Sequence, residues 1–336
     1  MSDVENIKKK ERILGLDLIK AIAILFVIGV HFFIYTDFYT TNVTGYSMIS
    51  QVFLRTLFIC AVPLFLILMG YFSKDTKYSK SFFKKLVGLL TLYLLYGLIE
   101  YVILYDAFSI KEFLSKILNF DLSAYVWFVE MYIGLYLLTP FINTLYNNID
   151  IKMKKYLIII LVCLTFLPST INNKFIEGFA LPEFWVTLYP ICYFLIGKFI
   201  KEYQPKFNKF YLITTLILLL LVETIIEVGQ ASGSVYTVFF GYRFSLPVMI
   251  CSVLIFLILY DIKSKKATIN KLFMNISIVT FDIYLVSRTV QHFVYPYFLN
   301  IDIPSHRCVL YLFPAILSIL IIGFIIGMIR KKLIKI

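Results

Sequence analysis

Three ionisable side chains interrupt one long apolar stretch near the start of the chain. Asp17, Lys20 and His31 lie within residues 14–36, where most other side chains are apolar. At 100° per residue, Lys20 and His31 differ by only about 20° around a helix axis and stand roughly 16 Å apart along it, and Asp17 falls within about 40° of His31. One stripe therefore carries an imidazole, which can take a proton from a hydroxyl, above an ammonium, which can bind an anion.

The composition indicates that a membrane surrounds this stripe. The chain has 336 residues, of which 60% are hydrophobic and 15% charged, and its mean hydropathy is +0.87. We therefore expect an all-α polytopic membrane protein with a single membrane domain over residues 1–336, including short cytoplasmic tails at 1–13 and 331–336. The first apolar run exceeds twenty residues and lacks a small-residue cleavage site, so we interpret it as an uncleaved helix.

About ten transmembrane helices are predicted, because apolar runs of the length that crosses hydrocarbon recur ten times. Their approximate limits are residues 14–36, 50–72, 86–106, 124–146, 155–171, 181–200, 210–229, 237–260, 273–295 and 308–330. Residues 108–120 predict a short amphipathic helix at the outer interface, in which Ser109 and Glu112 have the spacing of a capping box.

The positive charges orient these helices. With the N-terminus inside, 24 of the 32 Lys and Arg residues fall in cytoplasmic segments and only four in outer loops. This asymmetry is the positive-inside pattern, so both termini are expected in the cytoplasm of a multi-pass cell-membrane protein. The formal charge of +12 is thereby explained by topology, and no nucleic-acid partner is expected.

Ionisable residues within membrane helices usually face a protein interior and mark a pathway. For His31 we favour that interpretation, whereas Lys20 has an alternative, which is to extend to the inner interface and pair there with Asp17. We expect several outer-half residues to line an outward-open cavity, with Glu130 and Arg288 as a pair. Besides those two, they are Arg55, Glu100, Arg243 and His292. Glu223 and Glu227 are expected to face the interface.

The five cysteines are scattered through the chain without a Cys-x-x-Cys pair. Such a pattern is typical of small packing residues. We therefore expect no disulfide framework and no metal site.

Several motifs, in their order along the chain, resemble those of the integral-membrane acyltransferase-3 family. The first helix has a basic residue followed after ten residues by a histidine, here Lys20 and His31. Four later stretches also resemble family segments; they begin at Val62-Pro-Leu-Phe, Val126-Trp-Phe-Val, Tyr193-Phe-Leu-Ile-Gly and Phe281-Asp-Ile-Tyr. Departures include Met69 where serine is common, Lys84-Lys85 in place of an Arg-x-x-Arg pattern, and Ser287-Arg288 where histidine is common.

The resemblance implies an enzyme, an acyltransferase that moves an acyl group, commonly acetyl, from cytoplasmic acyl-CoA to a hydroxyl of an extracytoplasmic polysaccharide or glycolipid. Acyl-CoA is then a cosubstrate, and no bound cofactor is expected. His31 is the candidate general base, with an acyl-histidine relay as the alternative. Lys20, Lys84 and Lys85 are the candidate contacts for the polyanionic CoA, although Lys84 and Lys85 also fit ordinary positive-inside anchoring.

The alternative function is an exporter or flippase of a cell-surface polysaccharide or lipid-linked sugar, without chemistry of its own. It would require a continuous polar path through the membrane. The sequence names neither the acyl group, nor the acceptor glycan, nor the oligomeric state.

Overall fold

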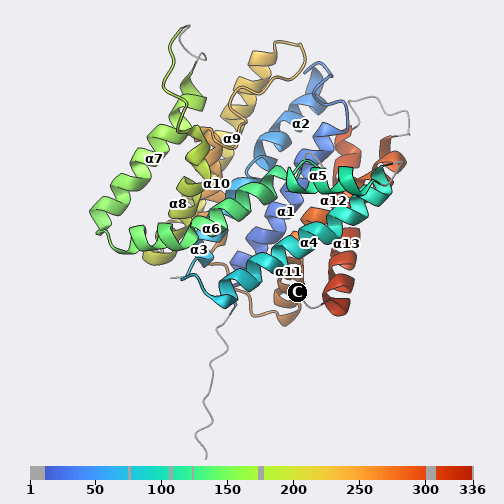
Figure 1. Ribbon diagram of the computed structural model, residues 1–336. Helices are drawn as coiled ribbons and strands as arrows, with labels where there is room; N and C mark the ends of the chain where they lie inside the picture. Colours follow the sequence, from blue (N-terminus) through green and yellow to red (C-terminus); the bar gives the residue numbers. More distant parts are fainter. Residues whose placement is uncertain are drawn as a thin grey trace, which may run out of the picture.

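The computed structural model describes residues 12–74, 77–105, 109–122, 125–172, 178–299 and 308–334, and over these ranges the chain is helical without a β-strand (Figure 1). The elements in chain order are α1 (Leu14–Ile34), α2 (Gly45–Phe58), α3 (Ala61–Phe72), α4 (Lys80–Leu104), α5 (Ile110–Leu118), α6 (Trp127–Asn147), α7 (Ile151–Ile171), the 3₁₀ helix η1 (Val186–Leu188), α8 (Tyr189–Tyr203), α9 (Lys209–Ala231), α10 (Leu246–Leu259), α11 (Ala267–Ile278), α12 (Thr280–Leu299) and α13 (Cys308–Leu333).

Every predicted membrane segment contains a helix, so the prediction of an all-α polytopic membrane protein is confirmed. Seven helical segments of the described chain are long and apolar enough to cross a bilayer, with α2 and α3 counted together. An eighth is obtained if α11 and α12, which are bent by 65° relative to each other, form one span. Helices α8 and α10 have 15 and 14 residues, which is less than the roughly 20 residues of a full span. The count of ten crossings and the cytoplasmic termini therefore stay predictions.

Helix α1 occupies the interior of the bundle. It packs against α2, α3, α10, α11, α12 and α13, and most of its residues are buried. In Figure 1, α4 and α6 run obliquely across the front of α1. The stripe that carries Lys20 and His31 is consequently surrounded by other helices along much of its length.

Ion pairs tie α1 and α12 to their neighbours at the end of the molecule where α1 begins and α13 ends (Figure 1). Arg12 donates to both carboxylate oxygens of Asp17 at 2.7 and 2.8 Å and to Ser277 of α11 at 3.2 Å. The partner of Asp17 is thus Arg12, and the alternative pairing with Lys20 is wrong.

A second buried pair joins α12 to α13 in the same region. Arg330 donates twice to Asp282, each time at 2.6 Å, and Tyr96 of α4 donates to the same carboxylate at 2.9 Å. Because a bidentate arginine–carboxylate contact fixes both distance and orientation, the pair holds α12 in register with α13 and α4.

Helices α3 and α8 cross at two glycines. A Cβ atom on Gly70 would overlap the carbonyl oxygen of Phe194, and one on Gly197 would overlap that of Ile67. The two backbones touch directly, as is common for small residues at membrane-helix crossings. Both glycines lie in stretches that resemble family motifs, so at these positions the motif residues serve packing.

The predicted short amphipathic helix is confirmed as α5, and its place at the outer interface stays a prediction. The Ser109 hydroxyl accepts a hydrogen bond from the Glu112 N–H at 3.4 Å, and Ile117 is the residue of this helix that is buried.

Cys60, Cys192 and Cys251 are buried free thiols, in agreement with a packing role, whereas Cys163 is an exposed free thiol of α7. The side chain of Cys308 lies outside the described part of the chain.

We expect Gly197→Ala to destabilise the protein by roughly 1–3 kcal/mol, because a methyl group there meets backbone atoms that cannot rotate away. The melting temperature of the detergent-solubilised protein measures this loss. Gly134→Ala in α6 is the matched control, since a Cβ at Gly134 would meet no atom within 4 Å. Equal melting temperatures for the two variants would contradict close α3–α8 contact.

Candidate active site

The ring of His31 lies face to face with the ring of Tyr125, the residue two positions before α6. The ring centroids are 3.5 Å apart and the planes differ by 3°. His31 is partly buried, and its Nδ1 atom is buried without a hydrogen-bond partner among the residues with assigned positions. Since a stacked neighbour limits rotation of the ring, the imidazole is held in one plane with one nitrogen available.

Arg288 of α12 places a cation beside this pair of rings. Its guanidinium carbon is 5.7 Å from the centroid of Tyr125 and 5.5 Å from that of Tyr35, and the guanidinium donates to the Tyr35 hydroxyl. Its Nε atom is 3.9 Å from a carboxylate oxygen of Glu100, which is buried in α4. The cation therefore has a fixed place between α1, α4 and α12.

The predicted pair of Glu130 and Arg288 is wrong. Glu130 is exposed at the start of α6, whereas Glu100 is only 4% exposed and lies next to Arg288. A buried charge is costly unless an opposite charge compensates it. Glu100 is buried and close to Arg288, so it is the partner of this cation.

Polar atoms without partners gather around the same place. The Tyr125 hydroxyl donates to Oε1 of Gln291 at 2.8 Å, which fixes the orientation of that amide. Its Nε2 atom and the hydroxyl of Tyr295 are both buried without a hydrogen-bond partner in the described part of the chain. An unsatisfied buried group costs about 1–3 kcal/mol, so this cluster is a candidate place for a water or another polar molecule to bind.

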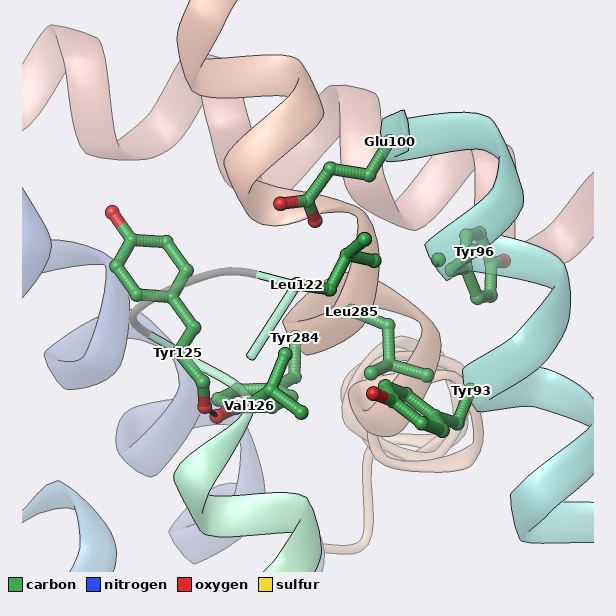
Figure 2. Close-up of a pocket in the computed structure, with 9 residues that line it drawn as sticks. Tyr93, Tyr96, Glu100, Leu122, Tyr125, Val126, Tyr284 and Leu285 are labelled. Carbon is green, nitrogen blue, oxygen red and sulfur yellow. Dashed lines mark hydrogen bonds between the residues drawn. The ribbon is translucent and has the colours of Figure 1, made fainter. Parts of the chain in front are cut away.

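A small, partly open pocket lies beside Tyr125 (Figure 2). Tyr125 belongs both to the pocket wall and to the stack on His31. The remaining wall residues come from α4, from residues 122 and 126, and from α12; they are Tyr93, Tyr96, Gly97, Glu100, Leu122, Val126, Tyr284 and Leu285.

The three candidate lysines do not form one cluster with His31. Lys20 is partly buried in α1, with its ammonium 5.1 Å from the centroid of the Phe72 ring. Lys84 and Lys85 are exposed near the start of α4, and neither makes a hydrogen bond or ion pair with a residue that the structure describes. Only Lys20 shares a helix with His31.

The broad outer cavity predicted from the sequence is not formed by all of its proposed residues. His292 is exposed, with its ring against Phe293, and does not join Arg288. It lies 100° around α12 from Gln291, which occupies the inward face. Arg243 places its guanidinium 3.8 Å from the centroid of the Trp127 ring.

Arg55 belongs to a second buried cluster, which also corrects the expectation for Glu223 and Glu227. These two glutamates are 3% and 0% exposed and lie inside the protein. Glu227 accepts the backbone N–H groups of residues 239, 240 and 241 at 3.0, 2.7 and 2.9 Å, while Arg55 donates to the Gly241 carbonyl at 2.8 Å and to Tyr39 at 3.4 Å. The two charges clamp the segment before α10 between α2 and α9.

Comparison with family models identifies the family of the chain. Residues 13–329 match the family model of the acyltransferase-3 family, described as an acyltransferase domain. The chain belongs to this family. It is therefore a multi-pass membrane acyltransferase, and the resemblance inferred from the ordered motifs is confirmed. No curated protein and no solved structure matches the chain.

Sequence reasoning missed the roles of Tyr35, Tyr125, Gln291 and Tyr295. A signal for two of them was present, because Arg288, Gln291 and Tyr295 follow one another at i, i+3 and i+7 and so share a face of α12. Tyr125 lies directly before the Val126-Trp-Phe segment, and its contact with His31 comes from the tertiary fold.

We expect Glu227→Gln to cost roughly 3 kcal/mol of stability, because an amide cannot replace both carboxylate oxygens that accept the backbone N–H groups. Hydrogen exchange of the amides of residues 239–241 should accelerate, as measured by mass spectrometry. Glu130→Gln is the control, since Glu130 is exposed. Unchanged exchange in Glu227→Gln would show that the clamp does not hold the segment.

Proposed function

We propose that this acyltransferase moves an acyl group, most simply acetyl, from cytoplasmic acyl-CoA to a hydroxyl of an extracytoplasmic polysaccharide or glycolipid in a bacterial plasma membrane. The observation that carries the proposal is the imidazole of His31, which lies inside the helix bundle with one ring nitrogen unpartnered among the described residues. The family membership supports group transfer over the alternative of transport without chemistry.

His31 serves as the general base in this proposal. As the acceptor oxygen attacks the thioester carbon, its proton passes to the imidazole and a tetrahedral oxyanion forms. The carbon–sulfur bond then breaks, and the leaving thiolate takes the proton back from the imidazolium. The products are an ester and free CoA thiol. An acyl-histidine intermediate would divide the same transfer into two steps.

Arg288 and Gln291 are suited to stabilise the oxyanion. Arg288 is oriented by Glu100 and Tyr35, and the Gln291 amide is oriented by Tyr125 so that its Nε2 donor remains available. Donors fixed before the reaction stabilise developing charge without reorganisation, which commonly contributes about 10²–10³-fold to the rate.

Lys20 is the proposed donor contact, because it lies on the stripe of His31, eleven residues closer to the start of α1. Its ammonium is a point charge suited to a phosphate or pyrophosphate of CoA. Lys84 and Lys85 are exposed, so they are accessible to the same polyanion from the cytoplasmic side; anchoring by the positive-inside rule is their alternative role.

Loss of the base should nearly abolish acylation. We expect His31→Ala to reduce O-acylation of the cell-surface glycan by about 10²–10⁴-fold, measured by mass spectrometry of the isolated glycan at equal membrane abundance of the enzyme. His292→Ala is the matched control, because that imidazole is exposed and apart from the cluster, and it should acylate normally. Unchanged acylation in His31→Ala would exclude His31 as the base.

Loss of the Lys20 charge should weaken donor binding while the chemical step persists. We expect Lys20→Met to raise the KM for acetyl-CoA by roughly tenfold, about 1.4 kcal/mol, with kcat reduced much less. Lys152→Met, at an exposed lysine of α7, is the control. A KM equal to that of the control would assign Lys20 to anchoring at the interface.

A further inference from the structure

We infer that the pocket between α4, α12 and residues 122–126 holds the acyl group of the donor and limits it to a short chain. The inference rests on the proposed function, and it adds the location of the acyl site and the residues that determine chain length.

The position of the pocket supports this inference. Tyr125 forms one wall of the pocket and also stacks on His31. Glu100 forms another part of the wall and lies 3.9 Å from Arg288. An acyl chain in the pocket would therefore lie beside the tyrosine that contacts the imidazole and beside the glutamate that faces the guanidinium.

Apart from Glu100, the walls offer rings and aliphatic groups rather than hydrogen bonds. The Tyr93 hydroxyl donates to the Ile117 carbonyl at 3.2 Å, the Tyr96 hydroxyl to Asp282 at 2.9 Å, and that of Tyr284 to the Tyr125 carbonyl. Because these hydroxyls are engaged with the protein, they are not available to bind a substrate in the pocket. A sugar would need several hydrogen-bonding partners, whereas an acyl chain needs apolar contact.

The pocket has one polar end. Figure 2 shows the Glu100 carboxylate at one end, and Leu285, Val126 and Tyr93 at the other. This arrangement places the methyl terminus of an acyl group among the apolar side chains, with its carbonyl toward the end where the Arg288 guanidinium, 3.9 Å from Glu100, can compensate negative charge.

Because residue 97 is a glycine, neighbouring side chains can approach its backbone closely. A Cβ atom at this position would lie 2.9 Å from Cδ1 of Ile117 and 3.0 Å from Cδ2 of Leu122. Leu122 is itself a wall residue, so a methyl group on residue 97 pushes the wall and reduces the space for the acyl chain. Both neighbours are flexible side-chain ends, and alanine favours a helix over glycine, so the variant should fold.

Single substitutions in the wall should then change the selectivity for acyl-chain length in opposite directions. An additional methylene that fits an apolar pocket raises the affinity about fourfold. One that does not fit lowers the affinity roughly tenfold or more. Gly97→Ala should strengthen rejection of longer chains, and Leu285→Ala, which removes apolar atoms from the far end, should relax it.

The experiment measures binding of CoA, acetyl-CoA and butyryl-CoA to the purified full-length protein in nanodiscs by isothermal titration calorimetry. The readout is the ratio of the butyryl-CoA Kd to the acetyl-CoA Kd. We expect a ratio of about ten or more for the wild type, a higher ratio for Gly97→Ala, and a ratio lowered roughly tenfold for Leu285→Ala. Gly134→Ala should match the wild type.

Two results would overturn the inference, and they have different consequences for the proposed acyl-CoA donor. Equal ratios in all four proteins, with CoA itself bound, would place the acyl group elsewhere and leave the proposed donor intact. Absence of binding of all three ligands to the wild type would overturn the acyl-CoA donor and, with it, the pocket assignment.

Discussion

A polar or charged side chain inside a membrane protein needs a partner within the protein, because hydrocarbon offers none. This constraint explains why α1 lies inside the bundle. Its stripe of ionisable groups faces neighbouring helices, and Arg12, which precedes the helix, compensates Asp17 at its start. The same constraint explains the pair of Asp282 with Arg330 and the clamp of Glu227 on backbone N–H groups.

The buried polar and charged groups are of two kinds, those that have hydrogen-bond partners and those that lack them. Charges with full sets of partners lie between helices and fix their relative positions, as Asp282 and Glu227 do. Among the described residues, buried atoms without partners occur at several places, such as the carboxylate of Glu223, but those of His31, Gln291 and Tyr295 lie near the held cation of Arg288. A group that has already formed its hydrogen bonds cannot bind a substrate strongly, so the unsatisfied cluster is the part of the interior that is suited to chemistry.

Much of the fold was predictable because hydrophobic run length and cap spacing are local. Every membrane segment contains a helix, and the cap at Ser109 lies where the spacing placed it. Partners were less predictable, since helical periodicity assigns a residue to a face but does not say which helix covers that face. Glu100 in place of Glu130 beside Arg288, and the burial of Glu223 and Glu227, are decided by packing between helices distant in sequence. Motif glycines such as Gly70 were likewise recognisable, but their role in backbone contact required the fold.

The central claim is that a donor on the cytoplasmic side reacts with an acceptor on the opposite side through the enclosed site at His31. It is tested most directly in sealed membrane vesicles of defined orientation that contain the enzyme and its native surface glycan, with radiolabelled acetyl-CoA added outside. The account predicts labelled glycan inside inside-out vesicles, and none in right-side-out vesicles unless acetyl-CoA is loaded within them. Equal labelling in both orientations from external acetyl-CoA, or label on glycan that faces the added donor, would contradict it.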